Sequence, residues 1–571
     1  MIHAWARRAD LIAIGALAIV LCLVPWTGYA WGDGLEFVAV SSHLGIAHPT
    51  GYPLFTLISW LFIEAVPLSP YRAVLLFCRL AILGTGTCVI LSVRELWRQF
   101  AVGREDSPIP SILAVAFCFS GLMLAGARMV EVYALNGFFL SLLILLSLRS
   151  ASRATLLLAG VAMGLSASHH LTSLCMGPLV LLIFLRGCAV SDLRYWAIAG
   201  VVAMIAIPTI LYGTMPLRIP EESGYGIFWN EPRGIVGVGA MIRGGEYRQF
   251  QFLMESPNRA FTAATYLPFA WNRVVGLSDS FGGIYFGRGA TSFISGLLVL
   301  AVVGYGIAIS LRRRGARPWS ICLIVAGVLQ LAFVFTYNIP DIEDYFLGVH
   351  LVAFPFLLLG LGVGLRSFVS RWAMDAAKVD RASRVLAGAL AVVALLSSFS
   401  DQQGDARAIH QLWRERLLAA LPQGAAIVTR GDADTYTIWH EQFAEKERLD
   451  VLAYGANFSR FPWFRMTMNP KDPRRGMVGF RPGLPNSARE FVAILDELAI
   501  SPLVSGGPVY TTINDPDELG LLAVKYGIVP AAELLTAPEI EGLLASGSIQ
   551  IAPPVLYRID TRMPTAQTTL P

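Results

Sequence analysis

Residues 31–54 read WGDGLEFVAVSSHLGIAHPTGYPL and follow the first hydrophobic segment of the chain. The stretch holds two acids, Asp33 and Glu36, and two histidines, His43 and His48, among apolar residues and without a Lys or Arg. Acids three residues apart fall on one face of a helical turn, so both carboxyls can converge on one bound group. At a membrane surface such a pair predicts a functional site. The alternative is that Asp33 caps a short interfacial helix while Glu36 faces water.

The composition predicts a polytopic membrane protein. Of 571 residues 55% are hydrophobic and 15% charged, and the mean hydropathy is +0.58, which is too apolar for an ordinary soluble globule. The net charge of +4 is small and the basic residues lie in short loops, so nucleic-acid binding is excluded. The seven cysteines fall in or beside apolar segments without a C-x-x-C pair, which indicates neither a disulfide framework nor a zinc site.

About eleven apolar segments are long enough to be membrane spans. The first lacks a convincing small-x-small cleavage site, so we interpret it as a retained helix rather than a signal peptide. Residues 52–66 are also apolar, but at about 1.5 Å per residue they reach only about 22 Å, which predicts an interfacial or re-entrant helix. The predicted spans are 11–29, 73–93, 109–127, 132–148, 155–168, 173–185, 195–215, 293–311, 319–336, 345–365 and 385–398.

The distribution of arginine predicts the orientation, because Lys and Arg collect in short cytoplasmic loops. Alternate loops are basic, with Arg7 and Arg8 first and the arginines of 94–104, 149–153, 186–194, 312–317 and 366–384 after them. The N-terminus is therefore expected inside, and the Asp33 stretch and everything after residue 400 outside. The high Arg-to-Lys ratio and the lack of an ER-retrieval tail favour a bacterial inner membrane.

Two domains are predicted. Residues 1–399 form the transmembrane core, with a first external loop at 30–71 and a large external loop at 216–291 that is rich in Gly and aromatic residues and reads as a lid or acceptor platform. Residues 400–571 form a soluble extracytoplasmic α/β domain, with strands at 425–429 and 449–454 and a helix at 435–447. The tail MPTAQTTLP is expected to be disordered.

Polar residues recur at the outer level of several predicted spans. An ionisable group costs at least roughly 2.5 to 3.5 kcal/mol at the middle of the membrane and less near the surface. Several such groups at one level therefore predict a shared, hydrated cavity. These residues also have simpler interpretations. Arg128 and Glu131 could form an ion pair at a helix end, one of His169 and His170 could be structural, and the acids at 341–344 could lie in a solvated loop. The candidates are Asp33, Glu36, His48, Tyr52, Arg128, Glu131, Tyr133, Asn136, His169, His170, Arg218, Asp341, Asp344 and Tyr345.

The order of motifs is a family signature. GDGLEF, HPTGYPLF, ARMVEVYALNGFF, SHHLT, PLRIP, FWNEPRG, GGEYRQF and YNIPDIEDYF follow one another along the chain. Together they resemble the membrane glycosyltransferases of the GT-C superfamily, and more closely the protein O-mannosyltransferase-like family, over about residues 10–365. Protein O-mannosyltransferases proper have adjacent Asp and Glu in the first loop, whereas Gly34 and Leu35 separate the two acids here.

The resemblance implies transfer of a sugar from a polyprenyl-phosphate donor to a protein, lipid or glycan acceptor at the outer membrane face. Direct displacement needs a base, for which Asp33 is suited, and a positive group for the leaving phosphate, for which Arg128, Arg218 or a histidine is suited. Glu36 with His48 or Asp341 could instead orient a divalent ion such as Mg²⁺ or Mn²⁺. The alternatives are a flippase for lipid-linked glycans, a glycan ligase of similar architecture, and a membrane-anchored binding protein.

The C-terminal part has no motif that the family resemblance transfers, so we expect it to assist acceptor binding or stability. Its segment GDADTYTIWHEQ, residues 431–442, reads as a strand-to-helix turn in which Asp432 or Asp434 caps the helix rather than as a catalytic site.

Overall fold

The computed structural model describes residues 2–26, 32–100, 102, 107–221, 224–244, 270–278, 280, 292–337, 342–372, 376–399, 403–481, 485, 487–545 and 552–560. The chain divides into two compact units that do not follow the order of the sequence. The first comprises Met1–Pro25, Leu75–Tyr212 and Gly244–Asp401, and the second Trp26–Val74, Gly213–Arg243 and Gln402–Pro571.

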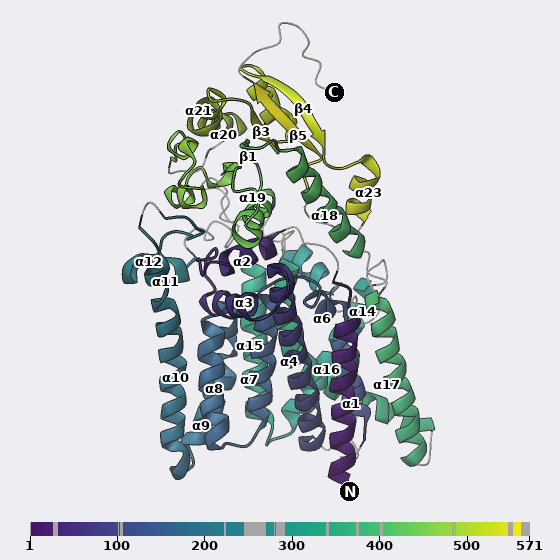
Figure 1. Ribbon diagram of the computed structural model, residues 1–571. Helices are drawn as coiled ribbons and strands as arrows, with labels where there is room; N and C mark the ends of the chain where they lie inside the picture. The colour runs from purple at the N-terminus through teal and green to yellow at the C-terminus, as the bar shows by residue number, and fades with distance from the viewer. Residues whose placement is uncertain are drawn as a thin grey trace. The chain divides into compact units, whose positions relative to one another are not determined.

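The first unit consists of helices (Figure 1), and each predicted span contains one. The predicted span over 109–127 holds two helices, because the first ends at Cys118 and the Ser120 hydroxyl caps the next by accepting from the Met123 N–H. The helices are α1 (Ile2–Leu23), α4 (Pro70–Gln99), α5 (Ile109–Cys118), α6 (Gly121–Ala125), α7 (Tyr133–Leu148), α8 (Arg153–Ala167), α9 (Gly177–Cys188), α10 (Arg194–Gly213), α14 (Ser292–Arg312), α15 (Arg317–Thr336), α16 (Phe346–Trp372) and α17 (Ala376–Phe399).

Several of these helices have the length and composition of membrane spans. Within the described residues six qualify: Pro70–Gln99, Leu171–Cys188, Ser191–Arg218, Ile294–Arg312, Arg317–Thr336 and Phe346–Phe368. The protein is therefore an α-helical integral membrane protein, and the count of eleven spans stays a prediction. Residues 53–65 form α3 (Pro53–Ala65), a 13-residue apolar helix too short to cross a bilayer.

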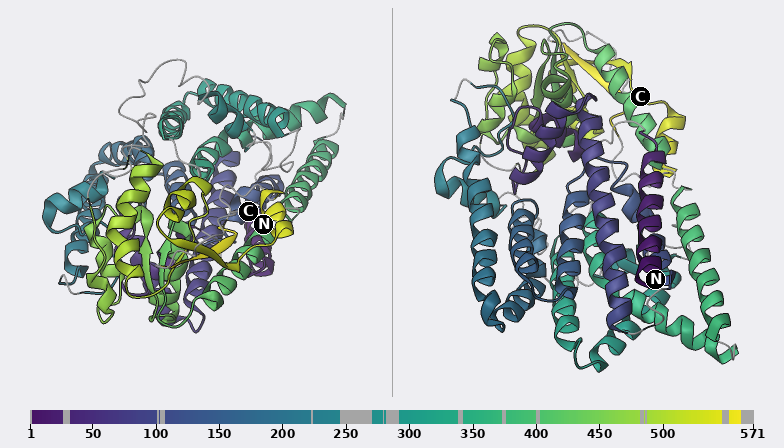
Figure 2. Two further views of the ribbon diagram at one scale, coloured as in Figure 1. Left: turned by 90° about the horizontal axis from the view of Figure 1, so that it is seen from above. Right: turned by 60° about the horizontal axis from the view of Figure 1, so that its bottom comes forward.

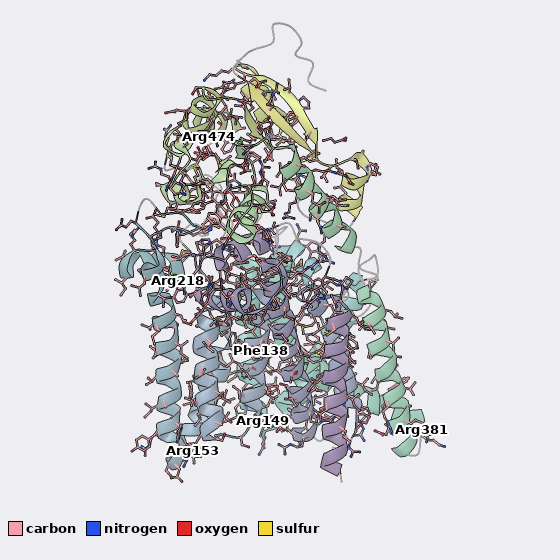
Figure 3. All side chains as sticks on the ribbon, in the orientation of Figure 1. Phe138, Arg149, Arg153, Arg218, Arg381 and Arg474 are labelled. Carbon is pink, nitrogen blue, oxygen red and sulfur yellow. The ribbon has the colours of Figure 1, made fainter. Side chains whose placement is uncertain are left out.

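Small residues let the helices of the first unit approach closely. A side chain at Gly306 of α14 would meet the Phe356 carbonyl of α16 at 1.8 Å, so only glycine fits there. Helices α14, α15 and α16 pack on one another, and the right view of Figure 2 shows helices of this unit running side by side. Arg149, Arg153 and Arg381 are exposed at the end of this unit where the N-terminus also lies (Figure 3).

The second unit holds the only sheet among the described residues. Five strands, β1 (Ala426–Thr429), β2 (Leu452–Gly455), β3 (Val509–Thr511), β4 (Gly527–Glu533) and β5 (Val555–Asp560), lie in the order β2-β1-β3-β5-β4. β1 pairs in parallel with β2 and β3, while β5 runs antiparallel to β3 and β4. The four-residue strand β1 is buried throughout, as a central strand covered on both faces should be. The predicted α/β domain is thus confirmed in its fold class.

Helices and turns complete the second unit. Their core includes Trp413 and Leu417 of α18 (Gln403–Ala420), packed against Ile427 of β1. The remaining elements are α2 (Asp33–Ser41), α11 (Met215–Arg218), α12 (Gly234–Ile242), α19 (Asp432–Trp439), η5 (His440–Glu445), η6 (Ala456–Phe458), η7 (Pro462–Thr467), η8 (Pro473–Gly476), α20 (Ala488–Leu495), η9 (Asp496–Ile500), α21 (Ser501–Val504), α22 (Pro516–Ala523) and α23 (Ala537–Ala545). Residues 222, 223, 245–269, 279 and 281–291 of the large loop, and the C-terminal tail, lie outside the described residues.

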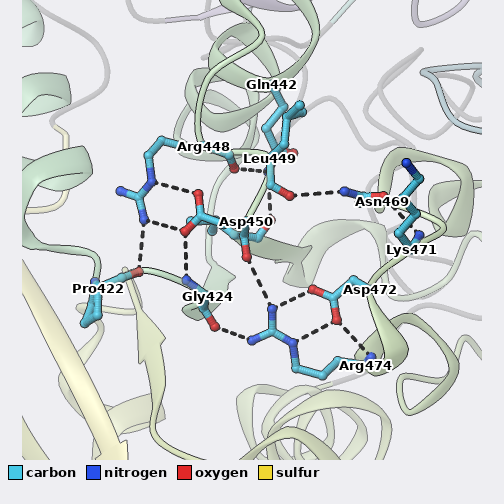
Figure 4. Close-up of polar contacts among 11 residues, drawn as sticks. Pro422, Gly424, Gln442, Arg448, Leu449, Asp450, Asn469, Lys471, Asp472 and Arg474 are labelled. Carbon is cyan, nitrogen blue, oxygen red and sulfur yellow. Dashed lines mark hydrogen bonds and ion pairs between the residues drawn. The ribbon is translucent and has the colours of Figure 1, made fainter.

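A network of arginines and aspartates holds the loops on either side of β2 (Figure 4). The Asp450 carboxylate accepts from the Gly424 N–H at 2.8 Å and from the Arg448 guanidinium. Arg474 pairs with Asp472 and donates to the Gly424 carbonyl at 2.6 Å. Three loops that are distant in sequence therefore meet beside the first and second strands.

The first loop belongs to the same unit because it packs on the C-terminal part of the chain. Helix α2 lies against α19 and η5. The Ile46 N–H donates to the Ile227 carbonyl at 2.8 Å, and a Cβ at Gly45 would meet that carbonyl at 2.4 Å, so glycine is needed for the approach. The division at residues 399 and 400 stays a prediction, and the first loop stands with residues after 400 in one compact unit.

Candidate active site

Glu36 and His48 form the centre of the site in the second unit. Glu36 lies on α2 and is fully buried, and its two oxygens bind one residue: Oε1 accepts from the His48 N–H at 2.9 Å, and Oε2 lies 2.6 Å from His48 Nδ1. A carboxylate accepts hydrogen bonds, so Nδ1 carries the proton and donates. The pair fixes the orientation of the imidazole and directs Nε2 away from Glu36.

Asp33 stands on the other side of the imidazole. Its Oδ2 lies 3.9 Å from His48 Nε2, and its side chain is 41% exposed. The residue that caps α2 is Gly32, so Asp33 is the first helical residue rather than the cap. The expected convergence of the two acids thus takes a different form, because both turn toward His48 and only Asp33 is open to solvent.

Aromatic rings enclose the His48 imidazole. The centroids of Phe37 and Tyr52 lie 5.2 and 5.3 Å from it, and that of Trp229 lies 6.1 Å away. Tyr52 caps α3 in a left-handed conformation and is buried. Our site prediction did not include Trp229, although the FWN motif that contains it was part of the family signature.

His43 lies just after α2 and anchors the first loop to Ile227. Its Nε2 accepts from the Ile227 N–H at 2.9 Å, and its ring packs on Phe443 with centroids 4.9 Å apart. Burial lowers the pKa of His43 to about 4. A ring that accepts at Nε2 and resists protonation is a neutral structural histidine.

The turn that begins α19 carries two acids with different environments. Asp434 is buried and accepts from the Arg430 N–H at 3.0 Å and from the Thr512 hydroxyl, and burial raises its pKa to about 6. Asp432 is exposed and accepts from the Asn457 amide at 3.1 Å. The strand-to-helix turn is as predicted for this segment, but the capping position is Gly431.

Arg218, the remaining candidate in this unit, ends α11. It is half-buried, and its guanidinium donates to the Thr214 hydroxyl at 2.9 Å. This one bond leaves further N–H donors on a delocalised cation, which suits a phosphate group.

Four candidates of the first unit, Tyr133, Asn136, His170 and Tyr345, form a second cluster that is largely neutral. The His170 ring lies 5.6 Å from that of Tyr133 and 5.5 Å from that of Tyr345. Thr172 links His170 to Asn136. The Thr172 hydroxyl lies 2.7 Å from His170 Nδ1 and accepts from the Asn136 amide at 3.3 Å. The hydroxyls and amide of such a cluster suit neutral polar ligands.

The two adjacent histidines have different partners. His169 is fully buried, and its Nε2 lies 2.8 Å from the Val132 carbonyl at the start of α7. It therefore joins α7 to the end of α8, whereas His170 belongs to the aromatic cluster.

Arg128 and Glu131 lie in the connection between α6 and α7. The i, i+3 ion pair considered for them assumed a common helix, and this connection is not helical. Arg128 is buried and Glu131 half-buried. Asp341 lies outside the described residues, and Asp344 belongs to η4 (Ile342–Tyr345).

Within the described residues no group of three or more His, Cys, Asp or Glu could hold a metal ion. The His48 Nδ1–H donates to Glu36, so the ring nitrogen that remains for any other partner is Nε2, which faces Asp33. Asp341, the other acid considered from the sequence for a divalent ion, lies outside the described residues.

Comparison with known proteins gives a family match. The family model for the N-terminal domain of the protein O-mannosyl-transferase TMEM260 matches residues 33–191. The chain is 24% identical to protein O-mannosyl-transferase TMEM260 of Mus musculus over 80% of its own length and 64% of the mouse protein. It is 22% identical to the tmem260 protein of Dictyostelium discoideum, over 83% of this chain and 61% of that protein. The chain thus spans less than two thirds of these relatives.

Solved structures give the fold. ArnT from Cupriavidus metallidurans bound to undecaprenyl phosphate superposes with a TM-score of 0.55 at 13% identity, covering 96% of this chain and 97% of ArnT. Its apo state gives a TM-score of 0.53 at 12% identity, with the same coverage. The protein therefore has the GT-C membrane fold. Its predicted resemblance to the protein O-mannosyltransferase-like family of that superfamily is confirmed.

Proposed function

We propose that this protein is a glycosyltransferase that moves a sugar, with mannose as the leading case, from a polyprenyl-phosphate donor to an acceptor hydroxyl, with protein Ser and Thr as the leading acceptors. The observation that carries the proposal is the arrangement of Asp33, His48 and Glu36. A partly exposed carboxylate beside an oriented imidazole supplies both a base and a polar partner for a reacting group. The names of the relatives and the undecaprenyl phosphate bound to ArnT support the same chemistry.

In the proposed reaction the acceptor oxygen attacks the anomeric carbon of the donor sugar. The bond between that carbon and the phosphate oxygen breaks, and the electron pair leaves with polyprenyl phosphate. The acceptor proton passes to the Asp33 carboxylate, which is the exposed acid of the pair. His48 stands next to Asp33 with its Nε2 and contributes a hydrogen bond to the reacting groups, while Glu36 positions it.

The other candidates receive binding roles in this proposal. Arg218 and Arg128 suit the donor phosphate, because a guanidinium binds phosphate oxygens bidentately. Tyr133, Asn136, His170 and Tyr345 suit sugar hydroxyls or the lipid, since they present neutral hydrogen-bonding groups and ring faces. The domain division at residues 399 and 400 and the platform role of residues 216–291 remain parts of the proposal.

We further propose that the N-terminus is cytoplasmic and the residues after 400 extracytoplasmic. The exposed Arg149, Arg153 and Arg381 lie at the same end of the first unit as the N-terminus (Figure 3), which fits the preference of arginine for the cytoplasmic side. The high Arg-to-Lys ratio favours a bacterial inner membrane, although the relatives reported above are eukaryotic. Cysteine labelling at an exposed position after residue 400 tests the orientation, and labelling only from the cytoplasmic side would contradict it.

The function is tested with the full-length chain purified in detergent. The donors are undecaprenyl-phosphate-linked mannose and glucose, each offered with a Ser/Thr-rich peptide, a lipid or a glycan acceptor. Release of undecaprenyl phosphate together with mass added to one acceptor class supports transfer. Absence of release from every donor, by protein whose melting temperature rises with undecaprenyl phosphate, would contradict the proposal while showing that the lipid binds.

A further inference from the structure

The C-terminal part of the chain carries an acid close to the Asp33–Glu36–His48 site. Asp432 is the first residue of α19, and α19 packs on α2, whose first residue is Asp33. Both helices begin with a Gly-Asp pair whose glycine is the capping residue. The two helices therefore bring an acid each from distant parts of the sequence.

A chain of side-chain contacts connects Asp432 with His48. The Asp432 carboxylate accepts from Asn457 of η6, and the next residue, Phe458, packs on Trp229 with centroids 5.4 Å apart. Trp229 in turn packs on the His48 imidazole. Trp229 is buried, so this contact fixes η6 and the α19 turn beside the imidazole.

The electrostatics of Asp432 show the same proximity. The surrounding protein raises the pKa of Asp432, the bond from Asn457 lowers it, and the negative charge of Glu36 raises it again. The charges of Arg460 and His48 lower it. An acid that interacts with both members of the Glu36–His48 pair lies within electrostatic range of the reacting groups.

We propose that Asp432 is a positioning residue of the active site, which adds a third negative charge near His48 and thereby favours the protonated imidazole. The C-terminal part would then act on the chemistry itself as well as on stability or acceptor binding. A protonated His48 offers a positive N–H donor to the leaving phosphate. That catalytic consequence rests on the proposed function, whereas the effect of Asp432 on His48 does not.

The charged and titratable groups that face this site come from each element packed there. Asp33 and Glu36 come from α2, Asp432 from α19, and Arg460 follows η6. The η5 element contributes His440, Glu441 and Glu445, which form a separate network with Arg414. Three acids therefore lie around His48 among these groups, while Arg460 interacts with Asp432.

The test measures the titration of His48 directly. The full-length protein is labelled with ¹⁵N-histidine, and the His48 signal is assigned by its loss in His48→Gln. Asp432→Asn should lower the midpoint of the His48 titration by about 0.5 to 1 pH unit, the shift expected when one nearby charge is removed from a partly solvated site. Asp432→Glu should restore most of it.

Asp517→Asn is the matched control, because Asp517 is an exposed acid in the first turn of another helix of the same unit, α22. It should leave the midpoint unchanged. An unchanged midpoint in Asp432→Asn would overturn the proposal, and so would an equal shift in the control. The measurement needs no substrate, so it stands or falls independently of sugar transfer. If transfer is also observed, Asp432→Asn should move the alkaline limb of kcat/KM to lower pH.

A cavity in the first unit carries a second, independent inference. It has a volume of about 250 Å³ and lies among the ends of α4, α7, α9 and α15. Its lining includes Arg149, Arg186 and Gln99, and Arg186 also donates to the Ser147 carbonyl at 2.8 Å. Trp319 closes one side with its indole N–H bonded to the Ser147 hydroxyl.

We infer that this cavity binds the phosphate of an anionic phospholipid headgroup. Two guanidinium groups in a polar hollow at the arginine-rich end of membrane helices match a phosphate at the bilayer surface. The test compares melting temperatures in nanodiscs of phosphatidylglycerol and of phosphatidylcholine. Phosphatidylglycerol should raise the melting temperature of the wild type. It should also raise that of the control Arg153→Gln, because Arg153 is exposed nearby but does not line the cavity.

Arg149→Gln should lose this increase and should retain less phosphatidylglycerol on purification. An equal increase in Arg149→Gln would overturn the inference. Stabilisation of the detergent-purified protein by inorganic phosphate alone, to the same extent as by the lipid, would also overturn it, because the site would then be one for free phosphate.

Discussion

Two buried glutamate–histidine pairs lie in the second compact unit, and their surroundings differ. Glu441 lies 3.2 Å from the His440 imidazole and also accepts from Arg414 at 2.6 Å. Burial would raise the pKa of Glu441, but the His440 bond and the Arg414 charge lower it below its usual value. Glu36 binds only one residue among its described hydrogen-bond partners, His48, and the other side of that imidazole meets the exposed Asp33.

The difference indicates which pair does chemistry. A buried carboxylate that an arginine neutralises, next to a histidine with no exposed surface, stabilises the fold but cannot meet a substrate. Beside the Glu36–His48 pair lies Asp33, an acid that solvent and an acceptor can reach. If this reading holds, substitutions in one pair change stability and substitutions in the other change turnover.

The largest effect is expected at Asp33. Asp33→Asn removes the proposed base and should lower turnover by roughly 10²- to 10⁴-fold, the usual contribution of a positioned base. Donor binding should persist because the phosphate contacts are elsewhere. The measurement is turnover and melting temperature on the same detergent-purified protein, with Asp33→Ser in parallel.

Asp33→Ser separates catalysis from a role in starting α2. Serine retains an oxygen that can bond to the first turn but cannot act as the base, and loss of a helix cap costs only about 0.5 to 2 kcal/mol. If Asp33→Ser turns over at the wild-type rate, Asp33 is not the base, and the Glu36–His48 pair would no longer differ from the Glu441–His440 pair in catalytic role.

The next effect is expected in the structural pair. Arg414→Met leaves the Glu441 carboxylate buried without its cation, and breaking a buried ion pair costs about 3 to 5 kcal/mol. The melting temperature should fall strongly, and turnover per folded molecule should change little. Arg416→Met on the same helix is the control, because its partner Glu539 is near the surface, where a pair contributes about 0 to 1 kcal/mol. Equal destabilisation by the two variants would contradict the assignment.

A smaller effect on turnover is expected for Glu36→Gln. Glutamine keeps the size of the side chain but removes the charge that holds the Nδ1–H of His48, and loss of a partner that orients a functional histidine typically costs about 10- to 100-fold. Glu441→Gln is its counterpart in the other pair and should act on the melting temperature. The comparison fails if Glu441→Gln lowers turnover of the folded protein as much as Glu36→Gln does.

Much of this organisation could be predicted from the sequence. Hydropathy located a helix for every predicted span, and the GDGLEF and HPTGYPLF motifs marked the residues that meet at His48. The burial of Glu36 could not be predicted, because i, i+3 spacing places two acids on one face without saying which side of the helix is covered. Helix α19, almost 400 residues further along the chain, packs on α2, and local periodicity carries no information about such a contact.

The same limit explains Asp432 and Trp229. A capping role was the natural reading of GDAD because Asp often begins a helix, yet the cap is Gly431 and Asp432 bonds to Asn457. Trp229 lies in a loop whose sequence shows only aromatic enrichment, and its contact with His48 depends on the pairing of Ile46 with Phe228. The positions of both residues depend on contacts between loops that are distant in sequence, and such contacts cannot be predicted from local sequence patterns.

The smallest effect is expected at His43. Unlike His48 and His440, His43 has no acid partner in its described hydrogen bonds. Its folded pKa of about 4 lies below the unfolded value of 6.5, so the unfolded chain binds the proton first. Stability is therefore unaffected above pH 6.5 and falls as the pH drops from 6.5 toward 4. The loss due to His43 should be about 1 kcal/mol at pH 5.5.

His43→Gln removes this pH dependence while keeping an acceptor for the Ile227 N–H, since glutamine Oε1 can take the place of the imidazole nitrogen. The melting temperatures of the two proteins are compared between pH 7.5 and 5. His410, whose pKa burial also lowers to about 4, contributes the same slope to both, so the difference isolates His43. The wild type should lose more stability than His43→Gln below pH 6.5. Parallel curves would mean that His43 is protonated as easily in the folded chain as in the unfolded one, and the first loop would then contain a second histidine available for proton transfer.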